Sequence, residues 1–477
     1  MSLEDESPGA LLQVLQRADT GGKLKRDGYV CVDGVLGDEL ATALAAELTA
    51  LFEQGHMEPN KVQFKLAQGR SLQFVKPNIY EFDMHALEGR GGGGCEARGG
   101  VGSGSEAGAG EGLAALLPRF QTIFREGAER IVGALNECLP ELELESGLGA
   151  RTVKLQVNAG KGGCFPFHYD NPGRCVCGVT GVPRREREEY LFLSRSLSLS
   201  LCLSLSLSLS LSLSSLSRSL ALSLTHTHTS FTSSTSSSFT PRPNKRKITV
   251  LFYLNRGWEE GDGGELQFVP FLRPAVTLPP LFDRMVAFRS DSVLHRVLPC
   301  TCARRLCFTV WLDGSDAAVN GDDDVFLRAK HLTAGTGEGA DAGGAALAAI
   351  KTTPLQRSVS RWVYHDEYEA SLRECFDPEA AAAAAATGVA ADAAAAAAAS
   401  QKRKEQEEQE EQEEQEDQED PEAAAARRKA STLGLRVMLK SHEAHMRQLA
   451  GNDTLRAMVR RLRGMKRKAA GGAEGGE

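Results

Sequence analysis

Three common signals are missing from this sequence of 477 residues. The segment Met1–Ser7 is acidic and has no basic stretch followed by an apolar one, the pattern of a secretory signal. The Ser/Leu alternation at 194–220 is nearly half serine, whereas a membrane-spanning helix needs about 20 predominantly apolar residues. The Gly-rich run at 89–112 lacks a following Gly-Lys-Ser/Thr and is therefore no phosphate loop. We expect a cytoplasmic or nuclear protein with no membrane partner.

A regular cysteine framework is also missing. The 11 cysteines are scattered, and the pairs Cys175-x-Cys177 and Cys300-x-Cys302 do not have the C-x2-C spacing of zinc knuckles. Free thiols in a reducing compartment are the favoured interpretation, ahead of a zinc site. The net charge of −8 combines an acidic run with a basic tail and indicates no particular partner.

Several long segments have low complexity, so the folded part is smaller than the chain length suggests. One catalytic unit of roughly 200 residues, an ordinary domain size, is expected. The predicted order is an N-terminal helix and strand support region at 1–150 with a Gly-rich loop at 89–112, a core at 151–314 interrupted by an insert at 175–242, a helical extension at 315–379, an Ala- and Gln/Glu-rich linker at 380–432, and a basic helical tail at 433–477.

The insert at 175–242 has an unusual composition. Serine and leucine alternate through most of 194–220, and Thr225–Thr229 alternates threonine with histidine. Repeated CT and CA dinucleotides encode these two patterns, which suggests translated non-coding DNA such as a retained intron. Deleting the insert joins Gly173-Arg174 to Pro243-Asn244 and leaves a natural turn into the next strand.

The remaining sequence alternates helical and strand patterns. Leu40, Leu44, Leu48 and Leu51 repeat at helical spacing after Gly37. Further helices are expected at 113–139, 358–376 and 433–463, and strands at 25–36, 153–158, around His168, at 248–255, 265–270 and 281–288, around His295, and at 307–312. The segment at 62–75 is ambiguous between a strand and other structure, and 76–83 is expected to be an ordered extended segment. Many short strands with helices mainly before them favour a β-sandwich or barrel packed against helices.

Three residues form a candidate metal site. His168 and Asp170 are two residues apart, so on one extended strand both side chains point to the same face. His295 supplies a third ligand far downstream. Two histidines and one carboxylate, with the other positions open, are the ligand set of non-haem Fe(II) oxygenases.

A 2-oxo acid bound to such an iron needs a cation for its distal carboxylate. Arg305 follows His295 by ten residues on the next strand of the series, and an arginine matches a carboxylate bidentately. Arg304 is the alternative, because neighbouring residues on a strand point to opposite faces. Tyr253 could add a hydroxyl to the same carboxylate.

Together these segments resemble the Fe(II)/2-oxoglutarate-dependent dioxygenase superfamily in its prolyl 4-hydroxylase-like branch, oxygen-sensor type. The resemblance covers 151–314 outside the insert well and 20–150 loosely. The matching segments are Phe167–Pro172, Tyr253–Asn255 with Trp258, Gly263–Leu266, Phe282–Arg284, Ser290-Asp291, His295–Val297 with Pro299, and Arg305 with Cys307–Trp311.

The resemblance implies an α+β fold with a double-stranded β-helix (jelly-roll) core and packing helices. It implies Fe(II) held by His168, Asp170 and His295, and 2-oxoglutarate anchored by Arg305 and Tyr253. Arg305 is preferred to Arg304 because the Arg-Leu-Cys-Phe-Thr run keeps the family's register. O2 is the other co-substrate, ascorbate supports the iron, and succinate and CO2 are the co-products.

The substrate implied by the resemblance is a prolyl residue of a protein or peptide. Two alternatives stay open: the same chemistry on another substrate, as another hydroxylase or a demethylase, and a non-catalytic binding protein disrupted by the insert. The basic cluster Arg460–Lys468 could be a nuclear signal or could bind nucleic acid, but a solvated basic tail is the favoured interpretation.

Overall fold

The computed structural model describes residues 10–65, 71–88, 112–171, 245–315, 355–377, 421–451 and 453–471. The Gly-rich loop up to residue 111, the insert at 175–242 and the Ala- and Gln/Glu-rich linker up to residue 420 lie outside these ranges, so the predictions made for them stay predictions. The chain divides into two compact units: one holds 1–181, 244–390 and 435–477, and the other holds 182–243 and 391–434. Of the second unit, only 421–434 is described.

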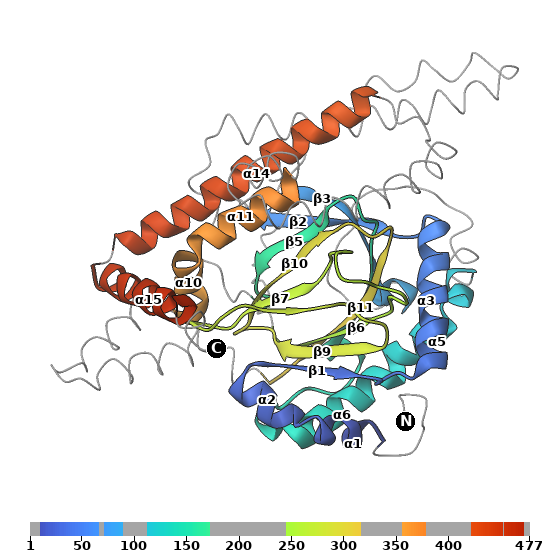
Figure 1. Ribbon diagram of the computed structural model, residues 1–477. Coiled ribbons are helices and arrows are strands. Elements are labelled where there is room, and N and C mark those ends of the chain that lie inside the picture. Colours follow the sequence, from blue (N-terminus) through green and yellow to red (C-terminus); the bar gives the residue numbers. More distant parts are fainter. Residues whose placement is uncertain are drawn as a thin grey trace, which may run out of the picture. The chain divides into compact units, whose positions relative to one another are not determined.

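Two antiparallel sheets form the centre of the first unit (Figure 1). The larger has seven strands in the order β1-β9-β6-β11-β4-β3-β2, and the smaller has four in the order β5-β10-β7-β8. The strands are β1 Tyr29–Asp33, β2 Glu58–Lys65, β3 Ser71–Asp83, β4 Arg151–Asn158, β5 Gly163–His168, β6 Arg246–Tyr253, β7 Leu266–Val269, β8 Val276–Leu278, β9 Arg284–Arg289, β10 Leu294–Cys300 and β11 Arg305–Asp313. Short β8 was not predicted, and the other strands lie where strands were expected or at the one ambiguous segment.

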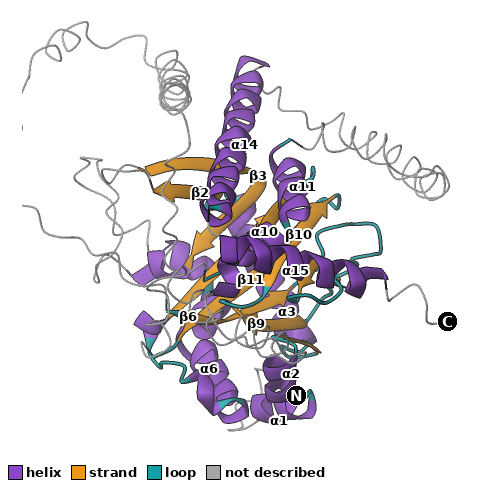
Figure 2. Cartoon of the chain, turned by 90° about the vertical axis from the view of Figure 1, so that its left-hand side faces the viewer, coloured by secondary structure: helices purple, strands orange, loops and turns teal. Residues whose placement is uncertain are grey.

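Helices, purple in Figure 2, surround the orange strands, and in the sequence they lie before, between and after strands. They are α1 Ala10–Arg17, α2 Thr20–Arg26, α3 Asp38–Glu53, α5 Pro118–Thr122, α6 Ala128–Cys138, α10 Leu355–Val363, α11 His365–Phe376, α14 Pro421–Ala450 and α15 Asp453–Gly471. Short helical segments are η2 Met84–Glu88, η3 Ile123–Gly127, η4 Pro140–Leu142 and η5 Leu148–Ala150. None of the helices in the described ranges is both long and apolar enough to cross a bilayer.

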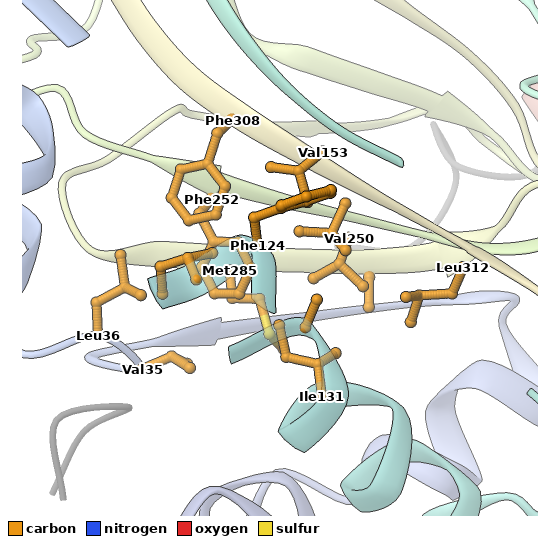
Figure 3. Packing of buried hydrophobic residues seen from close by; sticks show 14 of the residues in the cluster. Val35, Leu36, Phe124, Ile131, Val153, Val250, Phe252, Met285, Phe308 and Leu312 are labelled. Atoms are coloured by element: carbon orange, nitrogen blue, oxygen red, sulfur yellow. The ribbon is translucent and has the colours of Figure 1, made fainter. Parts of the chain in front are cut away.

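Alternate side chains of strand β6 lie in two different apolar regions: the hydrophobic core against the helices, and the interior between the two sheets. On β6, Val250 and Phe252 pack with Phe124 and Ile131 of the N-terminal helices, as Figure 3 shows. Tyr253, one residue further, belongs instead to the cluster of side chains between the two sheets. Because successive side chains of a strand point to opposite faces, one face of β6 serves the core and the other serves the interior.

Helix α3 follows its predicted pattern, since all four of its periodic leucines are buried. Its start is held by a residue distant in sequence. The Asp283 carboxylate accepts hydrogen bonds from the backbone N–H groups of Leu36 (2.7 Å) and Gly37 (2.9 Å). A carboxylate at this position accepts from N–H groups at the helix start that have no partner within the helix. Its negative charge is also stabilised by the positive N-terminal end of the helix dipole.

The C-terminal helices pack on the smaller sheet. The apolar stripe Leu455, Val459 and Leu462 of α15 is buried in a cluster with Val359 of α10 and Phe167 of β5. The prediction of one helix at 433–463 was wrong, because α14 ends at Ala450 and α15 begins at Asp453. The single helix expected at 358–376 is likewise two, α10 and α11, with Tyr364 between them. The Leu272 backbone N–H donates to the Tyr364 hydroxyl oxygen over 2.7 Å.

The two ends of the connection between β5 and β6 meet. After Asn171 the described chain resumes at Lys245. The Asn171 side-chain amide donates to the carbonyl of Arg246 over 2.8 Å. The place where the chain leaves the core and the place where it returns are therefore joined by a direct hydrogen bond.

Candidate active site

His168 and His295 are brought together by strand pairing. They are directly opposite each other in the antiparallel pair β5–β10. Their ring centroids are 4.3 Å apart. Directly opposed residues of an antiparallel pair project on the same face of the sheet, so the pairing places two imidazoles on the interior side.

Asp170 completes the group, although not as expected. It was predicted to lie on the same strand as His168, but β5 ends at His168 and Asp170 lies just beyond it. Its Oδ1 is 3.5 Å from His168 Nε2, and its Oδ2 is 3.8 Å from His295 Nε2. One ligand atom from each of the three residues lies within 4.8 Å of the other two. Within the described ranges, this is the one group of three His, Cys, Asp or Glu residues so arranged.

Backbone carbonyls orient both imidazoles. His168 Nδ1 lies 2.8 Å from the Pro166 carbonyl, and His295 Nδ1 lies 3.1 Å from the Val293 carbonyl. A carbonyl can only accept, so Nδ1 carries the proton in each ring and Nε2 keeps its lone pair. This is the second-sphere arrangement that prepares a histidine for a metal.

The Asp170 carboxylate is held by two donors on the larger sheet. Oδ2 accepts from Thr249 Oγ1 over 2.6 Å and from Trp311 Nε1 over 3.1 Å. Burial raises the pKa of Asp170, but the adjacent imidazoles and the Thr249 hydrogen bond outweigh burial and hold the pKa well below its usual value. Burial, together with the nearby His168, lowers the pKa of His295 to about 4. An ionised carboxylate and a neutral imidazole are the forms that bind a metal.

Arg305 lies on β11 and is buried, with 3% of its surface exposed. Its Nε donates to the Gly264 carbonyl over 2.7 Å, and its guanidinium lies 5.0 Å from the centre of the Tyr253 ring. Among the residues that the structure describes, no carboxylate pairs with it. A buried guanidinium without an anion is costly, so this arrangement fits an anionic ligand.

Tyr253 supplies a second unsatisfied group beside Arg305. Its side chain is fully buried, and its hydroxyl makes no hydrogen bond within the described ranges. Burial raises the pKa of Tyr253, so the hydroxyl stays protonated and can donate. A buried donor without a partner is expensive, which again points to an acceptor supplied by a ligand.

Arg304 points away from this interior. It is exposed, precedes the start of β11 and forms a salt bridge with Glu53 of α3 over 2.7 Å. The structure therefore brings Arg305, and not Arg304, to the face that carries Tyr253. The roles of both residues toward a co-substrate stay predictions.

Sequence patterns did not identify Thr249 and Trp311. Both lie in register on adjacent strands β6 and β11. The alternation of side chains along a strand could have found them. Thr249 shares a face of β6 with Tyr253, and Trp311 shares a face of β11 with Arg305. One face of these two strands thus contacts Asp170 at one end and carries the Arg305–Tyr253 pair at the other.

The basic tail is only partly solvated. Arg463 Nε donates to the Trp362 carbonyl over 3.0 Å, and Lys466 pairs with Glu367. Arg460 and Arg461 are exposed on the other face of α15. The expectation of a solvated tail was therefore wrong for the inner face, whereas a role in nucleic-acid binding stays a prediction.

Comparison with known proteins gives a family match. Residues 224–313 match the model of the 2OG-Fe(II) oxygenase superfamily. This range contains Tyr253, His295 and Arg305, while His168 and Asp170 precede it. The family implies Fe(II), 2-oxoglutarate and O2.

Solved structures of prolyl hydroxylases are similar to this chain. One is from a study of prolyl 4-hydroxylases from Phytophthora capsici, at 26% identity and a TM-score of 0.52, covering 97% of this chain and 98% of that chain. A Trichoplax adhaerens prolyl hydroxylase in complex with a hypoxia inducible factor peptide fragment has 16% identity, a TM-score of 0.36 and coverage of 65% and 94%. A Pseudomonas putida prolyl-4-hydroxylase has 17% identity, a TM-score of 0.31 and coverage of 64% and 99%.

The Phytophthora structure carries the fold comparison, because its TM-score is the highest of these three. The predicted α+β class with a double-stranded β-helix core is confirmed. The chain is therefore a dioxygenase with a 2OG-Fe(II) oxygenase domain, and it resembles the prolyl 4-hydroxylases.

Proposed function

We propose that this enzyme hydroxylates a prolyl residue of a protein or peptide, with 2-oxoglutarate and O2 as co-substrates and succinate and CO2 as co-products. One observation carries the proposal. An oriented His-Asp-His group and a buried Arg305 without a carboxylate partner lie on the interior faces of the same pair of sheets. A metal site and an anion site in one interior are what this chemistry requires.

The three proposed iron ligands are His168, Asp170 and His295. Two imidazole nitrogens and one carboxylate oxygen suit Fe(II) and leave further positions for co-substrates. When bound, Fe(II) with 2-oxoglutarate supplies O2 activation coupled to oxidative decarboxylation. The chain itself contributes oriented ligands, because the Pro166 and Val293 carbonyls fix both rings and Thr249 fixes the carboxylate.

Arg305 and Tyr253 are the proposed anchors of 2-oxoglutarate. A carboxylate of the co-substrate would satisfy both the guanidinium and the free Tyr253 hydroxyl. Gly264 fixes the direction of the Arg305 side chain through its carbonyl. The anchor is therefore oriented before the ligand arrives, which reduces the cost of binding.

Apolar side chains surround the proposed metal site. The ring of Phe288 lies 4.5 Å from that of His295, and the ring of Phe268 lies 6.3 Å from it. Both phenylalanines are fully buried. They exclude water from this side of the site, which strengthens electrostatic interactions inside it.

The prolyl part of the proposal is supported by similarity to the Phytophthora prolyl 4-hydroxylase structure. A protein or peptide substrate follows from that assignment. We also propose ascorbate as the reductant that sustains the iron over repeated turnovers. Omitting ascorbate should shorten the linear phase of product formation without changing its initial rate.

The test uses the full chain loaded with Fe(II) without oxygen, then mixed with O2, 2-oxoglutarate and a library of proline-containing peptides. Succinate release and a gain of one oxygen on proline are measured by mass spectrometry. We expect both activities, and we expect His168→Ala to lose them together with Mn(II) binding. His56→Ala is the matched control, because His56 is exposed and distant in sequence from the ligands.

The outcomes separate the parts of the proposal. Turnover that survives in His168→Ala would remove the assigned metal site. Oxygen incorporated at a residue other than proline would refute the prolyl assignment and leave the dioxygenase chemistry intact. Equal effects of Arg305→Ala and Arg304→Ala on the KM for 2-oxoglutarate would refute the anchor.

A further inference from the structure

Cys300 and Cys302 form a close thiol pair at the turn between β10 and β11. Their Sγ atoms are 3.2 Å apart, and neither is in a disulfide. Cys300 is fully buried, whereas Cys302 is half-buried. One residue of the pair is therefore partly exposed to solvent, and the other is buried with its sulfur in contact with the first.

This turn is bonded to the turn that holds Arg305. The N–H groups of Thr301 and Cys302 donate to the Asp262 carbonyl over 2.8 and 3.0 Å. The Gly264 N–H donates to the Pro299 carbonyl over 3.1 Å, and the Gly264 carbonyl accepts from Arg305 Nε. A shift of the Cys300–Cys302 turn is therefore passed to Arg305 both along the chain and through these hydrogen bonds.

We propose that Cys300 and Cys302 form a reversible disulfide by exchange with a low-molecular-weight disulfide, and that this disulfide weakens 2-oxoglutarate binding at Arg305. The effect on 2-oxoglutarate rests on the proposed function, whereas formation of the disulfide does not.

The exchange takes two steps. The Cys302 thiolate attacks one sulfur of the small disulfide and releases the other half as a thiolate. The Cys300 sulfur then attacks the mixed disulfide at Cys302, loses its proton and releases the second half as a thiol. Two protein thiols are oxidised and one small disulfide is reduced to two thiols, so electrons and protons balance.

The local electrostatics favour these roles. The hydrogen bond from Cys300 lowers the pKa of Cys302, with a smaller contribution from the charge of Arg305. The same contact and burial raise the pKa of Cys300, which keeps it a thiol until it resolves the intermediate. The sulfurs must close from 3.2 Å to a bond of about 2.05 Å, a movement that the exposed turn at Thr301 can absorb.

A metal site is a weaker interpretation of this pair. Two thiolates would need further ligands for zinc. Within the described ranges, no third His, Cys, Asp or Glu joins them in a group of ligand geometry. Cys164 and Cys375 also lie close to each other. Both are buried, so this second pair has no half-exposed cysteine that an incoming disulfide could reach.

The experiment treats the metal-free full chain with oxidised glutathione, blocks the remaining thiols and maps the chain by tryptic digestion. Cleavage after Arg296 and Arg304 gives one peptide, 297–304, that contains both cysteines. We expect this peptide to carry no blocking group and to have a mass lower by two hydrogens than its dithiol form. Dithiothreitol should return it to the dithiol. After Fe(II) loading, the KM for 2-oxoglutarate should rise roughly tenfold, as expected for weakening one charge-assisted hydrogen bond.

Two variants serve as test and control. Cys302→Ser should abolish both the light peptide and the change in KM, whereas Cys138→Ser on α6 should keep both. A peptide that stays fully blocked refutes the disulfide. A disulfide that leaves KM unchanged, or a KM change that persists in Cys302→Ser, refutes its effect on the site. If the reduced enzyme does not bind 2-oxoglutarate, the proposed function and the regulatory effect both fail, while the peptide mass still decides whether the disulfide forms.

Discussion

Gly264 and Arg305 are in direct contact across two turns. The Gly264 carbonyl accepts the Arg305 Nε hydrogen bond over 2.7 Å, and a Cβ added to Gly264 would lie 2.7 Å from Arg305 Cδ. Gly264 also has a φ of +75°, which side chains rarely adopt. Only glycine allows both this backbone conformation and this approach of the arginine side chain.

Gly264→Ala should therefore displace Arg305 and raise the KM for 2-oxoglutarate. Gly257→Ala is the matched control, because Gly257 has a φ of +83° with open space around its Cβ position. Both variants should lose about 1–2 kcal/mol of unfolding free energy from the backbone conformation. Steady-state kinetics and denaturant unfolding check these effects, and an equal KM change in both variants would contradict the contact argument.

Thr249→Val should weaken metal binding. The substitution keeps the shape of the side chain but removes the Thr249 hydroxyl that donates to Asp170 Oδ2, while the Trp311 donor stays in place. Loss of such an outer-sphere partner lowers metal affinity by about 10- to 100-fold. Mn(II) titration measures the change. Thr277→Val on the exposed face of β8 is the control, and similar affinities for the two variants would rule out this role of Thr249.

Leu462→Ala should destabilise the protein by about 2–5 kcal/mol, the usual cost of emptying a buried leucine site. Leu462 is 3% exposed in the cluster that joins α15 to α10. The neighbouring Arg461 is exposed, so Arg461→Ala should cost little. Denaturant unfolding of both variants measures the difference. Equal stability would mean that α15 does not pack on the core in solution.

His442 makes stability depend on pH. It is 2% exposed, its Nε2 lies 2.9 Å from His365 Nδ1, and its ring stacks on Tyr368. Burial, reinforced by the charges of His365, Arg361 and His445, lowers the pKa of His442 to about 3. Because this value is below the unfolded pKa of about 6.5, the unfolded chain binds the proton first as the pH falls. Stability is therefore lost progressively from about pH 6.5 down to about pH 3.

The predicted loss attributable to His442 is about 2 kcal/mol between pH 7 and pH 5. Urea unfolding at the two pH values measures it. His442→Gln should flatten the dependence by that amount, whereas His56→Gln, at an exposed position, should leave it unchanged. An unchanged slope in His442→Gln would show that another group is responsible.

Local patterns predicted the parts of the fold that depend on sequence period. The leucines of α3 and the apolar runs of β6 and β11 lie where expected, because burial of one face imposes a period on the sequence. The His168-x-Asp170 motif and the choice of His295 as a third ligand predicted that the two histidines share one site, and the geometry of the three side chains agrees with this. Their direct opposition in β5–β10 is a property of strand register, which no single segment contains.

The failures have a different physical origin. Asp170 is positioned by Thr249 and Trp311, which are distant in sequence, and not by the strand that carries His168. The C-terminal helices were expected, but their packing was not, since an apolar stripe such as Leu455, Val459 and Leu462 does not specify its partner. Long-range contacts decide both cases.

Asn171 and Arg246 are hydrogen-bonded on either side of the connection between β5 and β6, so the two ends are held together without the connecting chain. Strand pairs β4–β11, β5–β10 and β1–β9 each join a strand that precedes this connection to one that follows it. His168 and Asp170 therefore belong to one polypeptide half, and His295 and Arg305 to the other. A cut between Asn171 and Lys245 would turn all of these pairings into contacts between two fragments. The enzyme is therefore a candidate for a split protein in which activity depends on the association of two fragments.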